Sequence, residues 1–216
     1  MITTYPSSLS SSKKYSTAIF DLGSVLIKFD SLLVEKLLGN DVAIVSAREC
    51  KTIMHSPPFQ RCATGLISME EAFKELPQRF PSKKIEIVKK HPLAHALRPL
   101  EEGEKLFAYI RPRVEKVYIL SNIIPASFEY IAQQTHFVKD ADGYVLSYEA
   151  KSRKPDAEIY RQLLKKYNLA PGSALFIDDL KENCQAAAFL GIDSLVCDYR
   201  KNIQEFIQNL RFSKQL

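Results

Sequence analysis

Acidic residues follow two apolar segments, at positions where they could take part in phosphoryl transfer. Asp21 closes the segment 15–21 (YSTAIFD), and Asp178 and Asp179 follow the segment 174–177 (ALFI). A carboxylate at the end of a strand can act as a nucleophile. Two carboxylates that converge from separate strands suit Mg²⁺, which prefers oxygen ligands. Taken alone, Asp178-Asp179 also fits the N-cap of a following helix.

The hydrophobic pattern predicts a scaffold that brings these residues together. Apolar, strand-like runs occur at 15–21, 117–120, 174–177 and 194–197. Helical patterns at 157–167 and 183–190 alternate with them, which predicts a parallel α/β sheet with right-handed crossovers. In such sheets ligands bind at the carboxyl ends of the strands. We therefore expect Asp21, Ser121 and Asp178 to lie in one crevice, although a serine followed by Asn122 is also common in turns.

Residues 30–99 have a different pattern from the rest of the chain. Their apolar residues recur at helical spacing, with helices expected at 32–38, 42–54, 68–76 and 85–90. No run in this region reads as a strong central strand, which predicts an all-helical insertion after the first strand. The expected organisation is a disordered tail over 1–14, an α/β core over 15–29 and 100–216, and a helical cap over 30–99.

Four motifs follow one another in a defined order along the chain. They are FDLGSVL (20–26), ILSN (119–122), KPDAEIY (154–160) and FIDDLKENCQAAAFLGI (176–192). In this order, and with a helical insertion after the first motif, the chain from Tyr15 onward resembles the haloacid dehalogenase (HAD) superfamily. The similarity is greatest to the phosphatase-like members with a helical C1-type cap. The resemblance implies a three-layer Rossmann-like α/β core, an inserted all-helical cap and Mg²⁺-dependent hydrolysis of a small phosphorylated metabolite.

The resemblance also implies a role for each of the catalytic residues. Asp21 would attack phosphorus and form an aspartyl-phosphate. Ser121, with Asn122, would donate hydrogen bonds to the phosphoryl oxygens. Lys154 would supply a positive charge to the nucleophile and the phosphoryl group, with Lys151 as the less favoured alternative because it lies outside the Lys-Pro-Asp motif.

A magnesium site is implied at the same place. Asp21, Asp178 and the backbone carbonyl of Gly23 would bind Mg²⁺ directly, and Asp179 would orient these ligands without touching the metal. Asn183 is expected to support the loop after Asp179 and not to touch the substrate. For the cap we name Phe59 and Arg61 as candidate substrate contacts, because they lie in the segment that resembles the family's cap.

Gly23 departs from the family pattern. In most phosphatases of this superfamily the residue two positions after the nucleophile is a second aspartate, which protonates the leaving oxygen and later activates water. A glycine side chain cannot do general acid–base work, which typically contributes ~10²–10⁴-fold.

Three interpretations of Gly23 remain open. The first is a phosphatase for substrates whose leaving group departs easily, with sugar phosphates favoured and acyl or aryl phosphates as further options. The second is a weakly active or inactive protein that binds a phosphorylated ligand or partner. The third is a 2-haloacid dehalogenase, which would need no metal and fits the acidic pair at Asp178-Asp179 poorly.

Composition excludes several other classes of protein. The 216 residues are 46% hydrophobic and 25% charged, with seven glycines and a net charge of +5, which excludes disordered and collagen-like chains. No apolar run could span a bilayer, and no basic stripe interleaved with aromatic residues points to nucleic acid. Four widely spaced cysteines, without metal-site spacing, predict buried reduced thiols in a cytoplasmic protein. The oligomeric state is not predicted.

Overall fold

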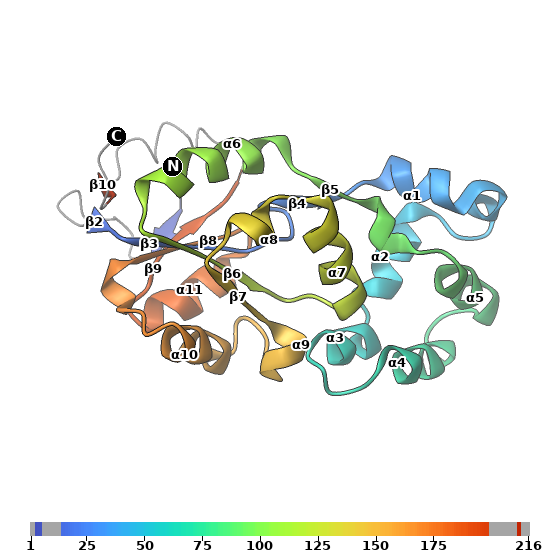
Figure 1. The fold of residues 1–216 in the computed structure, drawn as a ribbon. Helices are drawn as coiled ribbons and strands as arrows, with labels where there is room; N and C mark the ends of the chain where they lie inside the picture. Colours follow the sequence, from blue (N-terminus) through green and yellow to red (C-terminus); the bar gives the residue numbers. More distant parts are fainter. Residues whose placement is uncertain (1–2, 6–13, 199–210, 213–216) are drawn as a thin grey trace.

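The computed structural model describes residues 3–5, 14–198 and 211–212, and it contains a six-stranded sheet with helices on both faces (Figure 1). The sheet order is β1-β9-β8-β3-β6-β7. The strands are β1 (Thr4–Tyr5), β3 (Thr17–Phe20), β6 (Lys116–Ser121), β7 (Gly143–Leu146), β8 (Ala174–Asp178) and β9 (Asp193–Val196). Five of them pair in parallel, and only β1 runs antiparallel, along β9. The predicted α/β class with a three-layer core is confirmed.

Alternation of side chains along each strand explains the three layers. In β3, Ala18 and Phe20 belong to the apolar cluster that includes Phe107, whereas Ile19 belongs to the cluster that includes Tyr160. Successive side chains of a strand point to opposite faces, so a strand covered on both faces is apolar throughout. The first face is covered by α6 (Glu101–Ile110), α7 (Pro125–Gln134) and α8 (Phe137–Asp140). The second is covered by α10 (Ala157–Lys166) and α11 (Lys181–Phe189), and the short helix α9 (Ser147–Ala150) follows β7.

The predicted helical cap is present and has its own apolar core, which includes Val34, Ile53 and Leu76. Its helices are α1 (Ser31–Leu38), α2 (Ala47–Met54), α3 (Pro57–Ala63), α4 (Met69–Glu75) and α5 (Ser82–Lys90). The helix expected over 42–54 begins only at residue 47, because Ser46 and Glu49 form a capping box there. The capping box formed by Ser68 and Glu71 starts α4 in the same way.

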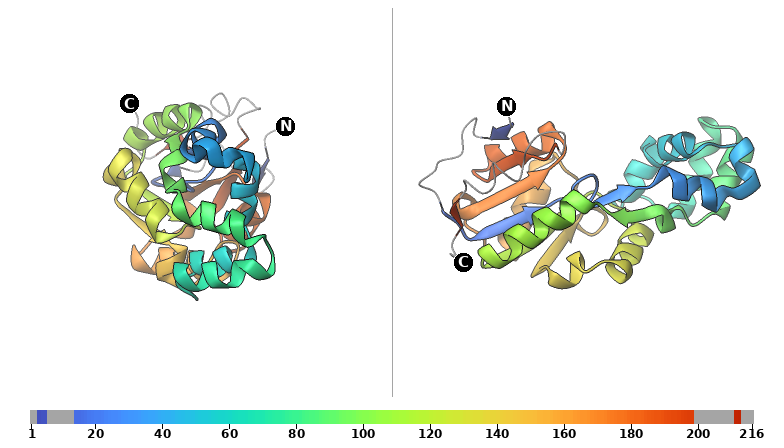
Figure 2. Two further views of the ribbon diagram at one scale, coloured as in Figure 1. Left: turned by 90° about the vertical axis from the view of Figure 1, so that its right-hand side faces the viewer. Right: turned by 90° about the horizontal axis from the view of Figure 1, so that it is seen from above.

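Two short strands, which the sequence analysis does not predict, connect the cap to the core. β4 (Ile27–Phe29) pairs antiparallel with β5 (Leu97–Pro99), so the chain enters and leaves the cap through one two-stranded ladder. Figure 2 shows the core and the cap as two lobes on either side of this connection. Strands of three residues carry too little pattern to stand out in a sequence.

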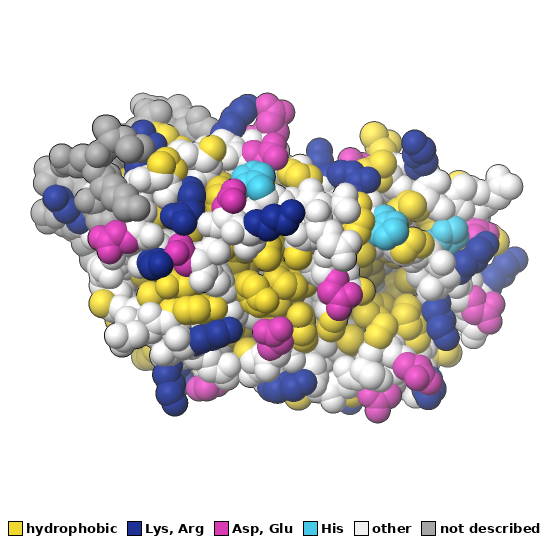
Figure 3. Space-filling model, viewed as in Figure 1, with side chains coloured by type: hydrophobic (Ala, Val, Ile, Leu, Met, Phe, Trp, Pro, Cys, Tyr) yellow, Lys and Arg dark blue, Asp and Glu magenta, His cyan; other side chains and the backbone are white. Residues whose placement is uncertain are grey.

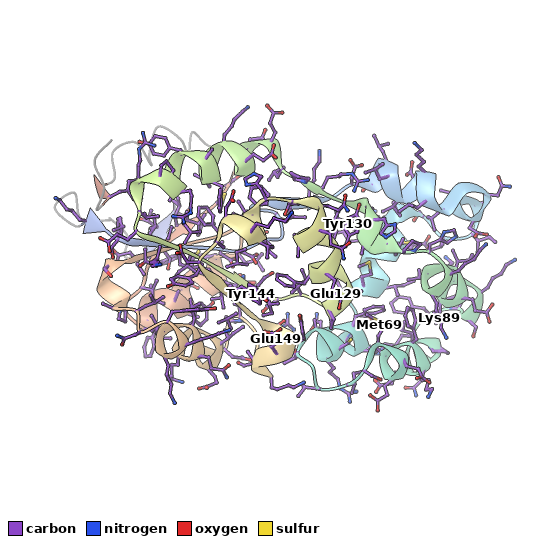
Figure 4. The ribbon with its side chains drawn as sticks, viewed as in Figure 1. Met69, Lys89, Glu129, Tyr130, Tyr144 and Glu149 are labelled. Carbon is purple, nitrogen blue, oxygen red and sulfur yellow. The ribbon has the colours of Figure 1, made fainter. Side chains whose placement is uncertain are left out.

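Further contacts join the two lobes beside the ladder. Tyr130 reaches from α7 toward the cap (Figure 4). Its hydroxyl accepts a hydrogen bond from Arg98 Nη1 at 2.9 Å, and its ring stacks on His95 with 4.7 Å between centroids. Gly65 has a φ of +66°, and a Cβ there would collide with the backbone of Tyr148. In the view of Figure 3, hydrophobic side chains also gather on the surface where the core meets the cap.

The expected tail over 1–14 differs from the structure at its described positions. Thr4–Tyr5 forms the edge strand β1, and Lys14 lies in β2 (Lys14–Tyr15), which pairs with β10 (Arg211–Phe212). The prediction of disorder is therefore wrong at these positions, and residues 1–2 and 6–13 lie outside the described part of the chain. All four cysteines are free and buried, as expected. Within the described residues, no helix is long and apolar enough to cross a membrane.

Candidate active site

The parallel pairing of β3, β6 and β8 brings Asp21, Ser121 and Asp178 to the same edge of the sheet. Phe20 pairs with Ile177 on one side and with Ile119 on the other, so β3, β8 and β6 end close together. The amide of Asp21 donates a hydrogen bond to the carbonyl of Ile177 at 2.9 Å. A cavity of about 490 Å³ opens at this edge, between the core and the cap, and Asp21, Ser121, Lys154 and Asp179 line it.

Lys154 is buried at the centre of this group. Its ammonium nitrogen lies 2.7 Å from Asp21 Oδ1, 2.7 Å from Asp178 Oδ2 and 2.8 Å from the carbonyl oxygen of Leu120. These three acceptors match the three hydrogens of an ammonium group. Lys151, by contrast, is exposed and donates to the carbonyl of Gly65 at 2.7 Å. The geometry therefore favours Lys154 as the lysine beside the nucleophile.

Asn122 lines the cavity, and its side chain contacts the backbone of Lys154. Its Nδ2 donates to the carbonyl of Lys154 at 2.9 Å, and its Oδ1 accepts from the amide of Lys154 at 2.9 Å. Both ends of the side-chain amide thus hold the Lys154 backbone in place. A role of Asn122 in binding phosphoryl oxygens stays a prediction, and the buried hydroxyl of Ser121 lines the cavity at the end of β6.

Asp178 is fully buried, and each of its carboxylate oxygens accepts hydrogen bonds. Oδ1 accepts from the amide of Leu180 at 2.8 Å and from Asn183 Nδ2 at 2.9 Å. Oδ2 accepts from Asn183 Nδ2 at 3.0 Å and from Lys154 at 2.7 Å. Asn183 therefore holds the carboxylate of Asp178 in place by hydrogen bonds to both oxygens, and so supports the loop after β8.

Asp179, unlike Asp178, is only half-buried and faces the cavity together with Gly23 and Ser24. One carboxylate oxygen from each of Asp21, Asp178 and Asp179 lies within 4.8 Å of the others. Hard oxygen donors at this spacing fit Mg²⁺. Asp179 is open to the cavity, whereas both oxygens of Asp178 already have partners within the protein.

The electrostatics of the site also favour a bound cation. Burial raises the pKa of Asp21 to about 7, against the opposing charge of Lys154 and with a further rise from Asp178. Burial, and then the charge of Asp178, raise the pKa of Asp179. Burial disfavours the ammonium of Lys154, but the carboxylates of Asp178 and Asp21 outweigh it, and the pKa of Lys154 is raised. Three carboxylates share one ammonium, so a divalent cation would relieve their repulsion.

The outer walls of the cavity are largely apolar. They are formed by side chains from the ladder, the cap and the loop after β6: Ile27, Phe29, Met54, Phe59, Leu97, Ile123 and Ile124. Of the two cap residues named from the sequence, Phe59 lines the cavity. Arg61 does not line it, and pairs with Glu75 at 2.8 Å. The prediction for Arg61 is wrong because a partner on α4 holds its guanidinium.

Several polar residues at the cavity were missed from the sequence: Lys51, His55, Gln60, Ser127 and Arg153. Lys51 lies in α2, His55 directly follows that helix, and Arg153 directly precedes Lys154. Arg153 could have been predicted to lie near the cavity, because it directly precedes the Lys-Pro-Asp motif. Nothing local marks Lys51 and His55, because their position depends on how the cap folds over the core.

Comparisons with known proteins identify the family of the chain. A family model described as a haloacid dehalogenase-like hydrolase matches residues 15–191. The chain is 26% identical over 184 residues to the sesquiterpene phosphatase astK of Aspergillus oryzae (strain ATCC 42149 / RIB 40), covering 84% of this chain and 89% of that protein. It is 24% identical over 196 residues to the drimenol cyclase drtB of Aspergillus calidoustus, covering 89% of this chain but 36% of that protein.

Solved structures show the same fold. The HAD family enzyme BT-2542 of Bacteroides thetaiotaomicron has a TM-score of 0.68 at 22% identity, covering 90% of this chain and 99% of that one. Its complex with magnesium and inorganic phosphate has a TM-score of 0.66 at 23% identity, covering 89% and 98%. The L-2-haloacid dehalogenase of Xanthobacter autotrophicus has a TM-score of 0.59 at 14% identity, covering 82% of this chain and 75% of that one. Since the family model spans most of the chain and the fold agrees with it, this protein belongs to the haloacid dehalogenase-like hydrolases.

Proposed function

We propose that the protein is a Mg²⁺-dependent phosphatase that acts on a small phosphorylated molecule through an aspartyl-phosphate on Asp21. The observation that carries the proposal is the contact of 2.7 Å between the buried ammonium of Lys154 and Asp21 Oδ1, at the floor of a cavity that Ser121 and Asp179 also line. A buried carboxylate beside a fixed positive charge suits attack on a phosphoryl group, whose own charge must be neutralised.

The chain's own residues divide the work of the reaction. Because Asp21 Oδ1 contacts Lys154, Oδ2 is the oxygen available to attack phosphorus in line with the departing oxygen. Ser121 would donate a hydrogen bond to a phosphoryl oxygen, and Lys154 would balance the charge of the nucleophile and the transferred group. Water then attacks the aspartyl-phosphate, which releases inorganic phosphate and restores Asp21.

Mg²⁺ would be held by Asp21, Asp179 and the backbone carbonyl of Gly23. When bound, it would neutralise the excess negative charge of the carboxylates and of the phosphoryl group. Asp178, held by Lys154 and Asn183, would keep the lysine and the adjacent loop in place.

The walls of the cavity favour an apolar substrate body. The sequence favours a sugar phosphate, but Phe29, Met54, Phe59 and Ile123 also line the cavity and offer no hydrogen-bonding partner to a sugar hydroxyl. Burying polar groups against such walls without partners costs free energy. The similarity to a sesquiterpene phosphatase also supports an apolar phosphate ester.

One alternative function is favoured by Gly23. No side chain at this position can protonate a leaving group, so a protein that binds a phosphorylated ligand with little turnover would have the same site. The dehalogenase alternative is disfavoured, because three carboxylates gathered within 4.8 Å suit a metal-dependent reaction. The experiments below distinguish a phosphatase from a phosphate-binding protein and from a dehalogenase.

The first test is Mg²⁺-dependent hydrolysis of p-nitrophenyl phosphate, whose leaving group needs no acid. We expect turnover by the wild type and a loss of about 10³-fold or more in Asp21→Asn, because the nucleophile is removed. Asp140→Asn serves as the matched control, since Asp140 is exposed and bonded to His136 outside the cavity. Equal rates for wild type and Asp21→Asn would contradict the proposal, and chloride release from a 2-haloacid without metal would indicate a dehalogenase.

The second prediction concerns pH. The pKa of Asp21 is raised from 3.8 to about 7, so without metal its contribution to stability is present below pH 3.8 and is lost as pH rises through 7. Mg²⁺ binds the deprotonated carboxylate and must displace a proton below pH 7. The increase in Tm at a fixed Mg²⁺ concentration should therefore grow between about pH 5 and pH 8. An increase that is constant or larger at low pH would contradict this assignment.

The third prediction concerns the missing acid. A Cβ at Gly23 would meet no atom within 4 Å, and its φ is not in the left-handed region, so Gly23→Asp should fold normally. We expect kcat/KM for an alkyl phosphate to rise by about 10²-fold, because an acid becomes available to the leaving alkoxide. Gly23→Asn is the control, with the same size and no acid. If the Asp and Asn variants have the same rate, the missing acid is not what limits the reaction.

A further inference from the structure

Two positively charged side chains line the active-site cavity in addition to Lys154. Lys51 is exposed on α2, and Arg153 is half-buried, with its Nη1 donating to Gln60 Oε1 at 2.9 Å. Neither forms an ion pair with an acidic residue in the part of the chain that the structure describes. Other cap lysines do, as Lys74 does with Glu70 at 2.8 Å. These two cations are therefore available to an anion from outside the chain.

The positive charge continues from the cavity onto the cap. A neighbouring groove of about 670 Å³ shares Lys51 and His55 with the cavity and is also lined by Arg48 and Arg79, with no acidic residue. His55 Nδ1 lies 2.7 Å from the carbonyl of Lys51, and a carbonyl only accepts, so Nδ1 carries the proton. This surface would attract a ligand with more negative charge than one phosphate ester carries.

Gly23 gives an independent argument about the leaving group. Without an acid at residue 23, the position two after Asp21 cannot protonate the departing oxygen. An alkoxide is about as basic as hydroxide, whose conjugate acid has a pKa of about 15.7. A phosphate monoester has a second pKa of about 6 and is stable as a dianion at neutral pH. A phosphate leaving group thus needs no acid, and it would itself be the second anion at Lys51 and Arg153.

We propose that the cavity takes an organic diphosphate with an apolar group, and that its second phosphoryl group is bound by Lys51 and Arg153. The inference rests on the proposed phosphatase function and specifies its substrate class. The apolar group would occupy the space between Phe29, Met54 and Phe59, and the terminal phosphoryl group would meet Asp21.

The reaction balances without an acid in the protein. Asp21 Oδ2 forms a bond to the terminal phosphorus, and the bond from that phosphorus to the bridging oxygen breaks. The bridging oxygen keeps the electron pair and leaves as part of the phosphate monoester. Water then attacks the aspartyl-phosphate, so that the products are the monoester, inorganic phosphate and one proton released to solvent. Lys51 and Arg153 would stabilise the charge that grows on the departing phosphate.

A binding experiment tests the subsite without relying on turnover. The probes are decyl phosphate and decyl diphosphate, which differ only in the second phosphoryl group, titrated calorimetrically into Asp21→Asn with Mg²⁺. We expect the diphosphate to bind at least about tenfold more tightly, and Lys51→Met in the same background to reduce this preference about tenfold. Lys36→Met is the matched control, because Lys36 is exposed on α1 and does not line the cavity. Equal affinities for the two probes, or equal effects of the two lysine variants, would overturn the inference.

Product analysis with the wild type separates this inference from the proposed function. Decyl diphosphate should yield decyl phosphate and inorganic phosphate, with kcat/KM at least about 10²-fold above that for decyl phosphate, whose alkoxide must leave unprotonated. Formation of decanol and diphosphate, or a preference for decyl phosphate, would overturn the inference. If the wild type hydrolyses neither compound nor p-nitrophenyl phosphate, the proposed phosphatase function fails, while the binding preference still decides whether the subsite exists.

Discussion

The ion pairs of Lys154 with Asp21 and Asp178 are the interactions on which the site depends. Two carboxylates from different strands and a lysine from a third segment are all buried, and removal of one partner from such a group typically costs about 3–5 kcal/mol because a charge is left unpaired. Asn122 fixes the backbone of the lysine, and Asn183 fixes Asp178. The same contacts therefore join the ends of the strands and preorganise the groups that meet a phosphoryl group.

The core and the cap make different contributions around this group. The core supplies the carboxylates and the hydroxyl of Ser121 at the carboxyl ends of parallel strands, and Lys154 from the segment between α9 and α10. The cap and the ladder of β4 and β5 supply most of the apolar wall and the cation Lys51. Since the reacting groups come from the sheet, the cap can vary to suit a substrate without disturbing the chemistry. Gly23 also affects the choice of substrate. Because residue 23 offers no acid, a substrate must carry a leaving group that departs without one.

The features predicted correctly from the sequence are those with a strong local signal. β3, β6 and β8 are buried on both faces, so their apolar runs and their terminal polar residues stand out. β7 escaped notice because its first two residues are only half-buried, and β4 and β5 because they are three residues long. Asp178 and Asp179 are adjacent in sequence but meet different surroundings, because successive side chains at a strand end point to opposite sides. The motif alone does not show whether the side chain of Asp178 or that of Asp179 points into the cavity.

In the proposed reaction, Asp21 takes up a phosphoryl group without an acid for the leaving oxygen. The most direct measurement is kcat/KM for a series of aryl phosphates of similar size, plotted against the pKa of the leaving phenol. We expect log kcat/KM to fall steeply as the pKa of the phenol rises, because the oxygen leaves with its full negative charge. A slope close to zero, with turnover that still requires Asp21, would mean that a group in the protein protonates the leaving oxygen, and would contradict the claim.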